Sequence, residues 1–162
     1  MVNIDNSDSG VTLTGSADAD RITNDAANVQ IDADDGDDYV ENWGDSVTID
    51  AGGGNDSIQN YGDEIEIDGG SGDDTITNFY GYDVIISGGA GSDHIKNYGS
   101  YSTIFGGDGA DTIYNENGYS SISGGAGNDT VEGNGKETIL FGTGDGKDVI
   151  TNYKTKTAIK LT

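Results

Sequence analysis

Hydrophobic residues recur along this chain with a fixed period. Two series of branched aliphatic residues each repeat every 18 or 19 residues, and the second series follows the first by about nine residues. The first series is Ile22, Val40, Ile58, Ile76, Ile95, Ile113, Val131 and Ile150. The second series is Ile31, Ile49, Ile67, Ile86, Ile104, Ile122, Leu140 and Ile159. Polar residues alternate with these positions, as in 64–68 (EIEID) and 74–78 (DTITN), and this alternation predicts short half-buried β-strands.

Glycine-rich turns separate the two strands of each period. Two strands and two turns describe one coil of a parallel solenoid, in which each coil hydrogen-bonds to the next. We therefore predict an all-β fold, a right-handed parallel β-solenoid (β-roll) of about eight coils of 18–19 residues. The solenoid is expected to span residues 15–151, with an entry strand or cap in 1–14 and a capping strand in 152–162.

Composition narrows the class of protein further. Ile, Val, Leu and Phe supply 31 of 162 residues and the net charge is −23, which without the repeat would be typical of a disordered chain. The charge argues against nucleic acid as a partner. The 28 glycines come without proline or a three-residue period, which excludes collagen, and the absence of cysteine excludes disulfides. We find no apolar stretch long enough for a transmembrane segment and no signal-peptide pattern.

One turn of each coil carries a six-residue pattern that ends in aspartate. The pattern G-G-x-G-x-D-x-(Ile/Val) occupies 69–76, 88–95, 106–113 and 124–131, and 51–58 differs at one position. Stacked coils would place these aspartates about 4.8 Å apart, where they repel each other unless a cation intervenes. Glycines at the second and fourth positions permit positive φ and allow carbonyl oxygens to converge. An all-oxygen shell of this kind favours Ca²⁺ over Mg²⁺.

The nonapeptides GGSGDDTIT, GGAGSDHIK, GGDGADTIY and GGAGNDTVE resemble the G-G-x-G-x-D-x-U-x motif of the repeats-in-toxin (hemolysin-type) family. The resemblance covers roughly residues 15–151. It implies a β-roll with one structural Ca²⁺ between each pair of stacked turns, folding that waits for extracellular calcium, and type I secretion of the unfolded chain. Only one turn per coil carries the motif here, so we expect a one-sided variant with a single file of four to six ions.

The resemblance also implies which residues bind the metal. The carboxylate ligands would be Asp38, Asp56, Asp74, Asp93, Asp111, Asp129 and Asp148. The carbonyl ligands would lie around Gly52, Gly54, Gly70, Gly72, Gly89, Gly91, Gly107, Gly109, Gly125, Gly127, Gly144 and Gly146. The two end turns depart from the pattern, because 15–20 lacks the second and fourth glycines and Lys147 adjoins the last aspartate.

The opposite turn carries two further columns. The first is an asparagine column, interrupted at Gly133, which predicts amides hydrogen-bonded from coil to coil. Its members are Asn24, Asn42, Asn60, Asn78, Asn97, Asn115 and Asn152. The second is an aromatic column that either fills space or binds a glycan or a surface partner. Its members are Trp43, Tyr61, Phe79, Tyr98 and Tyr153.

These patterns favour a calcium-binding structural module over an enzyme. The only histidine, His94, takes an exposed repeat position, and the regular acids are committed to the cation column. We expect a monomeric fragment of a secreted or cell-surface bacterial exoprotein: a stalk, an adhesin segment, or the carrier of a toxin or exoenzyme. The alternative is a carbohydrate- or surface-binding solenoid that uses the aromatic and asparagine face. Lysines gather near the C-terminus, where a membrane or secretion-recognition role stays open.

Overall fold

The computed structural model describes residues 1–142, 145–152 and 157–161, and in these residues all regular structure is β. Eighteen short strands alternate between two sheets. The first sheet contains β1 (Asn3–Asn6), β3 (Arg21–Asn24), β5 (Tyr39–Asn42), β7 (Ser57–Asn60), β9 (Thr75–Asn78), β11 (His94–Asn97), β13 (Thr112–Asn115), β15 (Thr130–Gly133) and β17 (Val149–Thr151). The second sheet contains β2 (Thr12–Thr14), β4 (Gln30–Asp32), β6 (Thr48–Asp50), β8 (Glu66–Asp68), β10 (Ile85–Ala90), β12 (Thr103–Gly109), β14 (Ser121–Gly127), β16 (Thr138–Phe141) and β18 (Ala158–Leu161).

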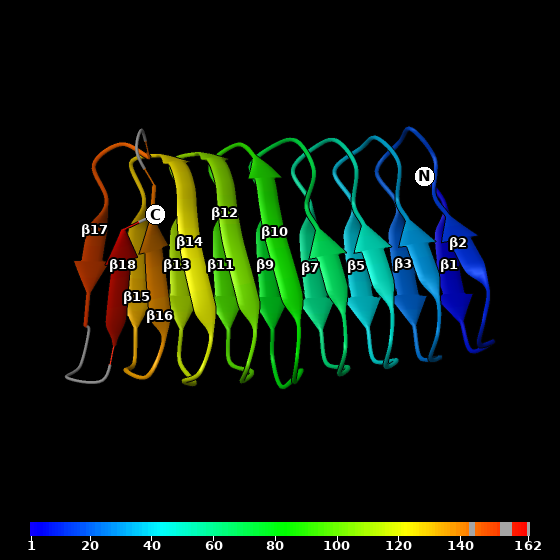
Figure 1. Cartoon of the computed structure of the whole chain (residues 1–162). Coiled ribbons are helices and arrows are strands. Elements are labelled where there is room, and N and C mark those ends of the chain that lie inside the picture. The colour runs from blue at the N-terminus through cyan, green and yellow to red at the C-terminus, as the bar shows by residue number, and fades with distance from the viewer. Residues whose placement is uncertain (143–144, 153–156, 162) are drawn as a thin grey trace.

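The chain winds as a parallel solenoid, as predicted. Each strand pairs in parallel with the strand two elements away, so the sheet orders are β1-β3 to β17 and β2-β4 to β18. The coils lie side by side along a rod, with the two ends of the chain at its opposite ends (Figure 1). The turns that follow the even-numbered strands lie at the top of that view, and those that follow the odd-numbered strands lie at the bottom. The glycine–aspartate turns are therefore all on one edge of the rod.

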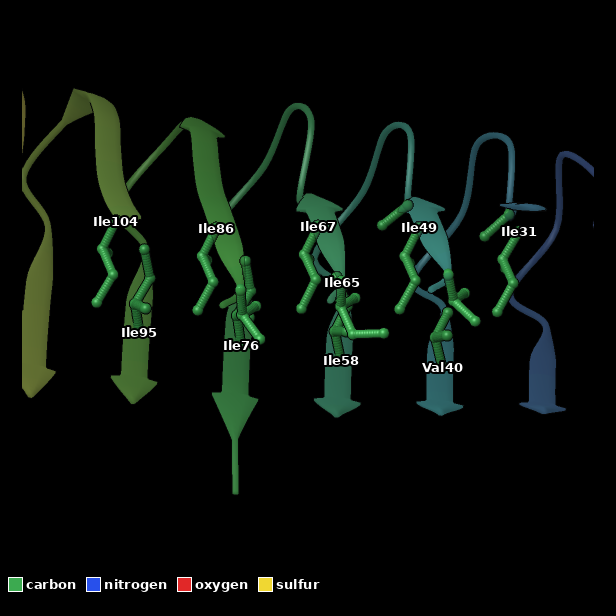
Figure 2. Close-up of a cluster of buried hydrophobic side chains, with 14 of the residues drawn as sticks. Ile31, Val40, Ile49, Ile58, Ile65, Ile67, Ile76, Ile86, Ile95 and Ile104 are labelled. Carbon is green, nitrogen blue, oxygen red and sulfur yellow. The ribbon is translucent and has the colours of Figure 1, made fainter. Parts of the chain in front are cut away.

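Stacked aliphatic side chains form the core between the two sheets. The first predicted column is confirmed, because Ile22, Val40 and Ile58 are in register and fully buried, and Ile4 of β1 extends the column by one coil. The second column faces it from the other sheet (Figure 2). Each such side chain contributes about 1.5–3 kcal/mol on burial.

Two positions of the second predicted column differ from the prediction: Leu140 does not belong to it, and Ile159 in the last strand is 52% exposed. Ile139, not Leu140, is in register with Ile122 and Ile159, and Ile139 is fully buried while Leu140 is half-buried on the outer face. The turn that precedes β16 is one residue shorter than its equivalent in the coil before. The strand therefore enters the sheet one residue earlier, which shifts every side chain to the opposite face.

A third buried column, which the sequence pattern did not predict, lies where the lower turns enter the even-numbered strands. It consists of Val29, Val47, Ile65, Val84, Ser102, Ser120 and Glu137. Its members change from aliphatic to polar along the rod. The core is therefore three side chains deep in the N-terminal coils and thinner toward the C-terminus.

Candidate calcium-binding turns

The repeated aspartates are buried inside the upper turns. From Asp20 to Asp129 their exposed fractions do not exceed 4%. The Oδ1 atom of each carboxylate from Asp38 to Asp148 accepts the backbone N–H of the aspartate one coil earlier, at 2.6 Å for the first of these bonds and 3.0 Å for the last. This ladder fixes the orientation of each carboxylate without any other side chain.

The second oxygen of most of these carboxylates is buried without a hydrogen-bond partner. The unpartnered atoms are Oδ2 of Asp38, Asp56, Asp74, Asp93, Asp111 and Asp129. Burial, reinforced by the neighbouring carboxylates, raises the pKa of Asp56 to about 6 and the pKa of Asp74 to about 7. A buried ionised oxygen without a partner costs several kcal/mol. The column therefore needs positive charge beside it to be stable in its ionised form.

Main-chain carbonyls lie close to these oxygens. A Cβ added to Gly88 would lie 2.3 Å from Asp93 Oδ2 and 2.5 Å from the Gly106 carbonyl oxygen, so both atoms converge beside the Gly88 Cα. Gly69 has the same two kinds of neighbour. The first position of the motif is thus closely packed, but it is not restricted to glycine, because Ala33 and Ala51 occupy the equivalent position in two earlier coils and are fully buried.

The second and fourth glycines adopt the predicted positive φ. In one turn, Gly89 has φ 108° and Gly91 has φ 140°. A Cβ on Gly89 would also lie 2.1 Å from the Gly70 carbonyl oxygen of the preceding coil. The same conformation occurs at Gly52, Gly54, Gly70, Gly72, Gly107, Gly109, Gly125, Gly127 and Gly146. Gly144, another predicted carbonyl position, lies outside the described residues.

The donor set suits a hard cation. Within the described residues, no three or more His, Cys, Asp or Glu side chains come together to hold a metal. An ion at these turns must therefore combine carboxylate oxygens with main-chain carbonyls. Shells composed of oxygen alone, with flexible geometry, are those of Ca²⁺. The unpartnered oxygens and the converging carbonyls fit this ion.

The C-terminal turn differs from the others in exposure. Asp148 is half-buried, whereas Asp129 is 1% exposed. Its Oδ1 still accepts the Asp129 N–H at 3.0 Å. Lys147 is exposed, and its backbone N–H donates to Asn128 Oδ1 at 3.0 Å. The ladder thus reaches Asp148, but solvent reaches this carboxylate as well.

The predicted asparagine ladder occupies the lower turns, and its side-chain amides both donate and accept hydrogen bonds. Asn97 Nδ2 donates to Asn115 Oδ1 at 2.7 Å and to the Gly99 carbonyl at 3.1 Å, and Asn97 Oδ1 accepts from Asn78 Nδ2 at 2.8 Å. The ladder runs from Asn6 to Asn115.

The ladder ends differently from the prediction. Asn152 is exposed and contacts Glu132 Oε1 at 3.4 Å, so it does not continue the column. At Gly133 the buried carboxylate of Glu137 occupies the space where an asparagine side chain would begin, and it accepts the Gly135 N–H at 2.8 Å. A residue of the third core column thus fills the gap in the asparagine column.

The aromatic column forms a stack of nearly parallel rings. Ring centroids are 3.9 Å apart between Trp43 and Tyr61, 4.7 Å between Tyr61 and Phe79, and 6.2 Å between Phe79 and Tyr98. Tyr153 lies outside the described residues. Neighbouring rings cover each other's faces within the stack, so this geometry fits side-chain packing between coils.

These features define a class of protein: a parallel β-roll with one file of cation-binding turns. The family model of the RTX calcium-binding nonapeptide repeat (4 copies) matches residues 66–77, 81–96, 100–122, 105–135 and 120–150. The chain belongs to this family, as its nonapeptides indicate, and its repeats are calcium-binding. Neither the curated proteins nor the solved structures contain a match to the chain. In the described part of the chain, no helix could cross a membrane.

Proposed function

We propose that this chain is a structural module of a secreted bacterial protein and that it folds when it binds extracellular calcium. The observation that carries the proposal is the file of buried, unpartnered Oδ2 atoms from Asp38 to Asp129. Their carboxylates, together with Asp148 and the carbonyls of the glycine turns, are the proposed ligands. Calcium supplies the positive charge that this column lacks when the carboxylates are ionised.

The chain's own residues prepare the sites. The backbone N–H of Asp74 holds Asp93 Oδ1 at 2.8 Å, which leaves Oδ2 directed at the space beside Gly88. The positive φ of Gly89 and Gly91 shapes the turn around that space. Each coil therefore orients its own carboxylate only when the coil before it is already in place, which couples successive sites to one another.

Folding and calcium concentration are linked by this arrangement. A net charge of −23 opposes compaction, and every bound ion both neutralises charge and stabilises the native state. Extracellular calcium modules bind with Kd of about 10⁻⁴ to 10⁻³ M, so their sites stay empty in the cytosol and fill outside the cell. This range supports an extracellular location and export of an unfolded chain.

A calcium titration tests the proposal directly. Far-UV circular dichroism would follow the full chain from a chelated sample through rising Ca²⁺, with Mg²⁺ at equal ionic strength as the control. We expect a cooperative transition to the β spectrum with Ca²⁺ alone. A β spectrum that is already complete in chelator would overturn the coupling of folding to calcium.

The competing functions have weaker support. Carbohydrate binding through the aromatic stack would use ring faces, but Trp43, Tyr61 and Phe79 lie face to face at interplanar angles of 3–4°. Catalysis would need a base in a pocket, and His94 is a half-buried member of β11 whose burial lowers its pKa. We propose that any chemistry of the parent protein resides in another domain.

A further inference from the structure

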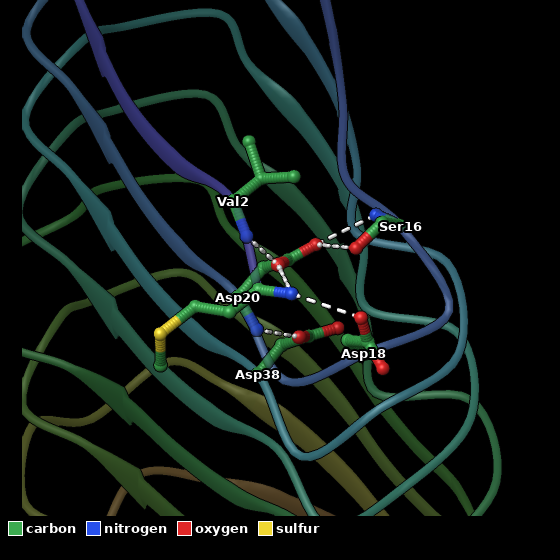
Figure 3. A network of polar contacts seen from close by, with 6 residues as sticks. Val2, Ser16, Asp18, Asp20 and Asp38 are labelled. Carbon is green, nitrogen blue, oxygen red and sulfur yellow. Dashed lines mark hydrogen bonds and ion pairs between the residues drawn. The ribbon is translucent and has the colours of Figure 1, made fainter.

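The first upper turn, residues 15–20, differs from the turns of Asp38 to Asp129 in how its aspartate is partnered. Asp20 is 4% exposed, as buried as its equivalents. Its Oδ2 accepts hydrogen bonds from the Ser16 N–H at 2.6 Å and from the Ser16 hydroxyl at 2.9 Å, and its Oδ1 accepts the Val2 N–H (Figure 3). Asp20 is thus fully satisfied by protein groups, while Oδ2 of Asp38 in the next turn has no partner.

The backbone of this turn differs as well. None of the residues 15–20 has a positive φ, whereas the next turn has φ 74° at Asp34 and 133° at Gly36. Asp34 thus takes the left-handed conformation that glycine takes in later turns. Ser16 and Asp18 stand where the motif has its second and fourth glycines. The conformational boundary between two kinds of turn therefore falls between residues 20 and 33.

The hydrogen bonds follow the same boundary. Both oxygens of Asp20 accept hydrogen bonds from Val2 or Ser16, so this carboxylate is satisfied without a metal. Asp38 Oδ1 accepts the Asp20 N–H, but Asp38 Oδ2 is buried without a partner. An ionised Asp38 therefore needs a cation that Asp20 does not need.

We propose that Ser16 ends the file of calcium sites at the N-terminal side of the rod. Its hydroxyl and amide occupy Asp20 Oδ2, the atom that remains free for a cation in the later turns, so Asp20 is not a calcium ligand. The inference rests on the proposed calcium binding by the later turns. It makes the first coils a cap that is formed without calcium, of the kind that the terminal repeats of solenoids supply.

Two substitutions convert this cap into a calcium turn. Ser16→Gly with Asp18→Gly changes residues 15–20 from GSADAD to GGAGAD, which has both glycines of the later turns. Isothermal titration calorimetry of the full chain with CaCl₂ should give one more ion per chain for this double variant than for the wild type. Asp18→Gly alone keeps the Ser16 contacts and should leave the number unchanged.

A second variant keeps the test decisive if the double variant does not fold. Asp20→Asn in the wild-type chain should leave the number of bound ions unchanged, and Asp56→Asn should lower it. In the double-variant background, Asp20→Asn should remove the added ion. Loss of one ion by Asp20→Asn in the wild-type chain, or a folded double variant with the wild-type number, would overturn the role of Ser16. A wild-type chain that binds no calcium would instead refute the proposed function.

Discussion

The upper and lower turns carry two buried polar columns that differ in one chemical respect. Asp93 directly precedes strand β11 and Asn97 is its last residue, and the two are 2% and 0% exposed. An amide both donates and accepts, so stacked asparagines satisfy one another and the turn backbone. An ionised carboxylate only accepts, so stacked aspartates are satisfied at Oδ1 and left open at Oδ2. A repeated polar residue can therefore close a solenoid by itself when it is an amide, and depends on a cation when it is a carboxylate.

Replacing an asparagine of the amide column with an aspartate should have the largest effect on the free energy of unfolding. Asn97→Asp would place a carboxylate opposite Asn115 Oδ1 and the Gly99 carbonyl, which now accept hydrogen bonds from Asn97. An uncompensated buried charge costs about 3–5 kcal/mol. We expect a loss of that size in urea unfolding at pH 7, in saturating calcium.

Asn55→Asp is the matched control for this exchange. Asn55 is exposed, its side chain accepts the Asp73 N–H at 2.7 Å, and Asp37 has the equivalent role one coil earlier. We expect a change within about 0.5 kcal/mol. Equal losses for Asn97→Asp and Asn55→Asp would show that the amide donor of the ladder is unimportant.

Removing one carboxylate should weaken calcium-dependent folding in a manner that depends on the turn. Asp93→Ala deletes a proposed ligand and the acceptor of the Asp74 N–H, so we expect a shift of the folding midpoint to higher calcium and a loss of about 2–4 kcal/mol in calcium. Asp20→Ala loses the hydrogen bonds of the cap, about 1–2 kcal/mol, and should leave the calcium dependence unchanged. Circular dichroism over a calcium titration measures both. Identical shifts of the midpoint would contradict the assignment of the two turns.

Protonation of the buried aspartates should partly substitute for bound calcium in stabilising the fold. The folded-state pKa of Asp74 is about 7 and that of Asp111 about 6, both above the ordinary value of 3.8 because of burial. A group with a raised folded-state pKa stabilises the fold fully below its unfolded pKa, and this stability is lost as the pH rises through the folded pKa. In chelator, β structure should therefore be greatest near pH 4 and decline between pH 4 and 7. Circular dichroism that stays flat, or that gains β structure as the pH rises, would contradict this sign.

The repeat made most of the fold predictable, because equivalent residues have equivalent neighbours in every coil. The error at Leu140 arose where Ile139 and Leu140 are both apolar, so the sequence did not reveal that the turn had lost one residue. The third column escaped notice because its aliphatic members give way to Ser102 and Ser120. In the site, the aspartates and glycines follow from the motif. The unpartnered Oδ2 atoms and the Ser16 contact could not be predicted from the sequence, because both depend on the orientation of each carboxylate.

The smallest expected effect concerns residues with left-handed backbone in the lower turns. Positive φ also recurs in the lower turns, at Asn28, Ser46, Glu64, Asp83, Tyr101, Tyr119 and Lys136. These positions carry side chains, whereas at Gly89 a carbonyl of the preceding coil occupies the place of Cβ. Left-handed φ alone costs about 1–2 kcal/mol, which a solenoid can tolerate, but a Cβ placed 2.1 Å from a carbonyl oxygen cannot be accommodated without moving the backbone.

Asp83→Gly should therefore stabilise the protein by about 0.5–1 kcal/mol, because Asp83 has φ 58° and glycine removes the left-handed strain. Asp68→Gly, in strand β8, changes the charge by the same amount and should destabilise by about 0.5–1 kcal/mol, since glycine in a strand loses backbone entropy. Urea unfolding in saturating calcium compares the two variants. Stabilisation by both would show that relief of charge repulsion outweighs backbone conformation. Opposite signs would show that the left-handed backbone at Asp83 is strained and that the lower turn tolerates this strain.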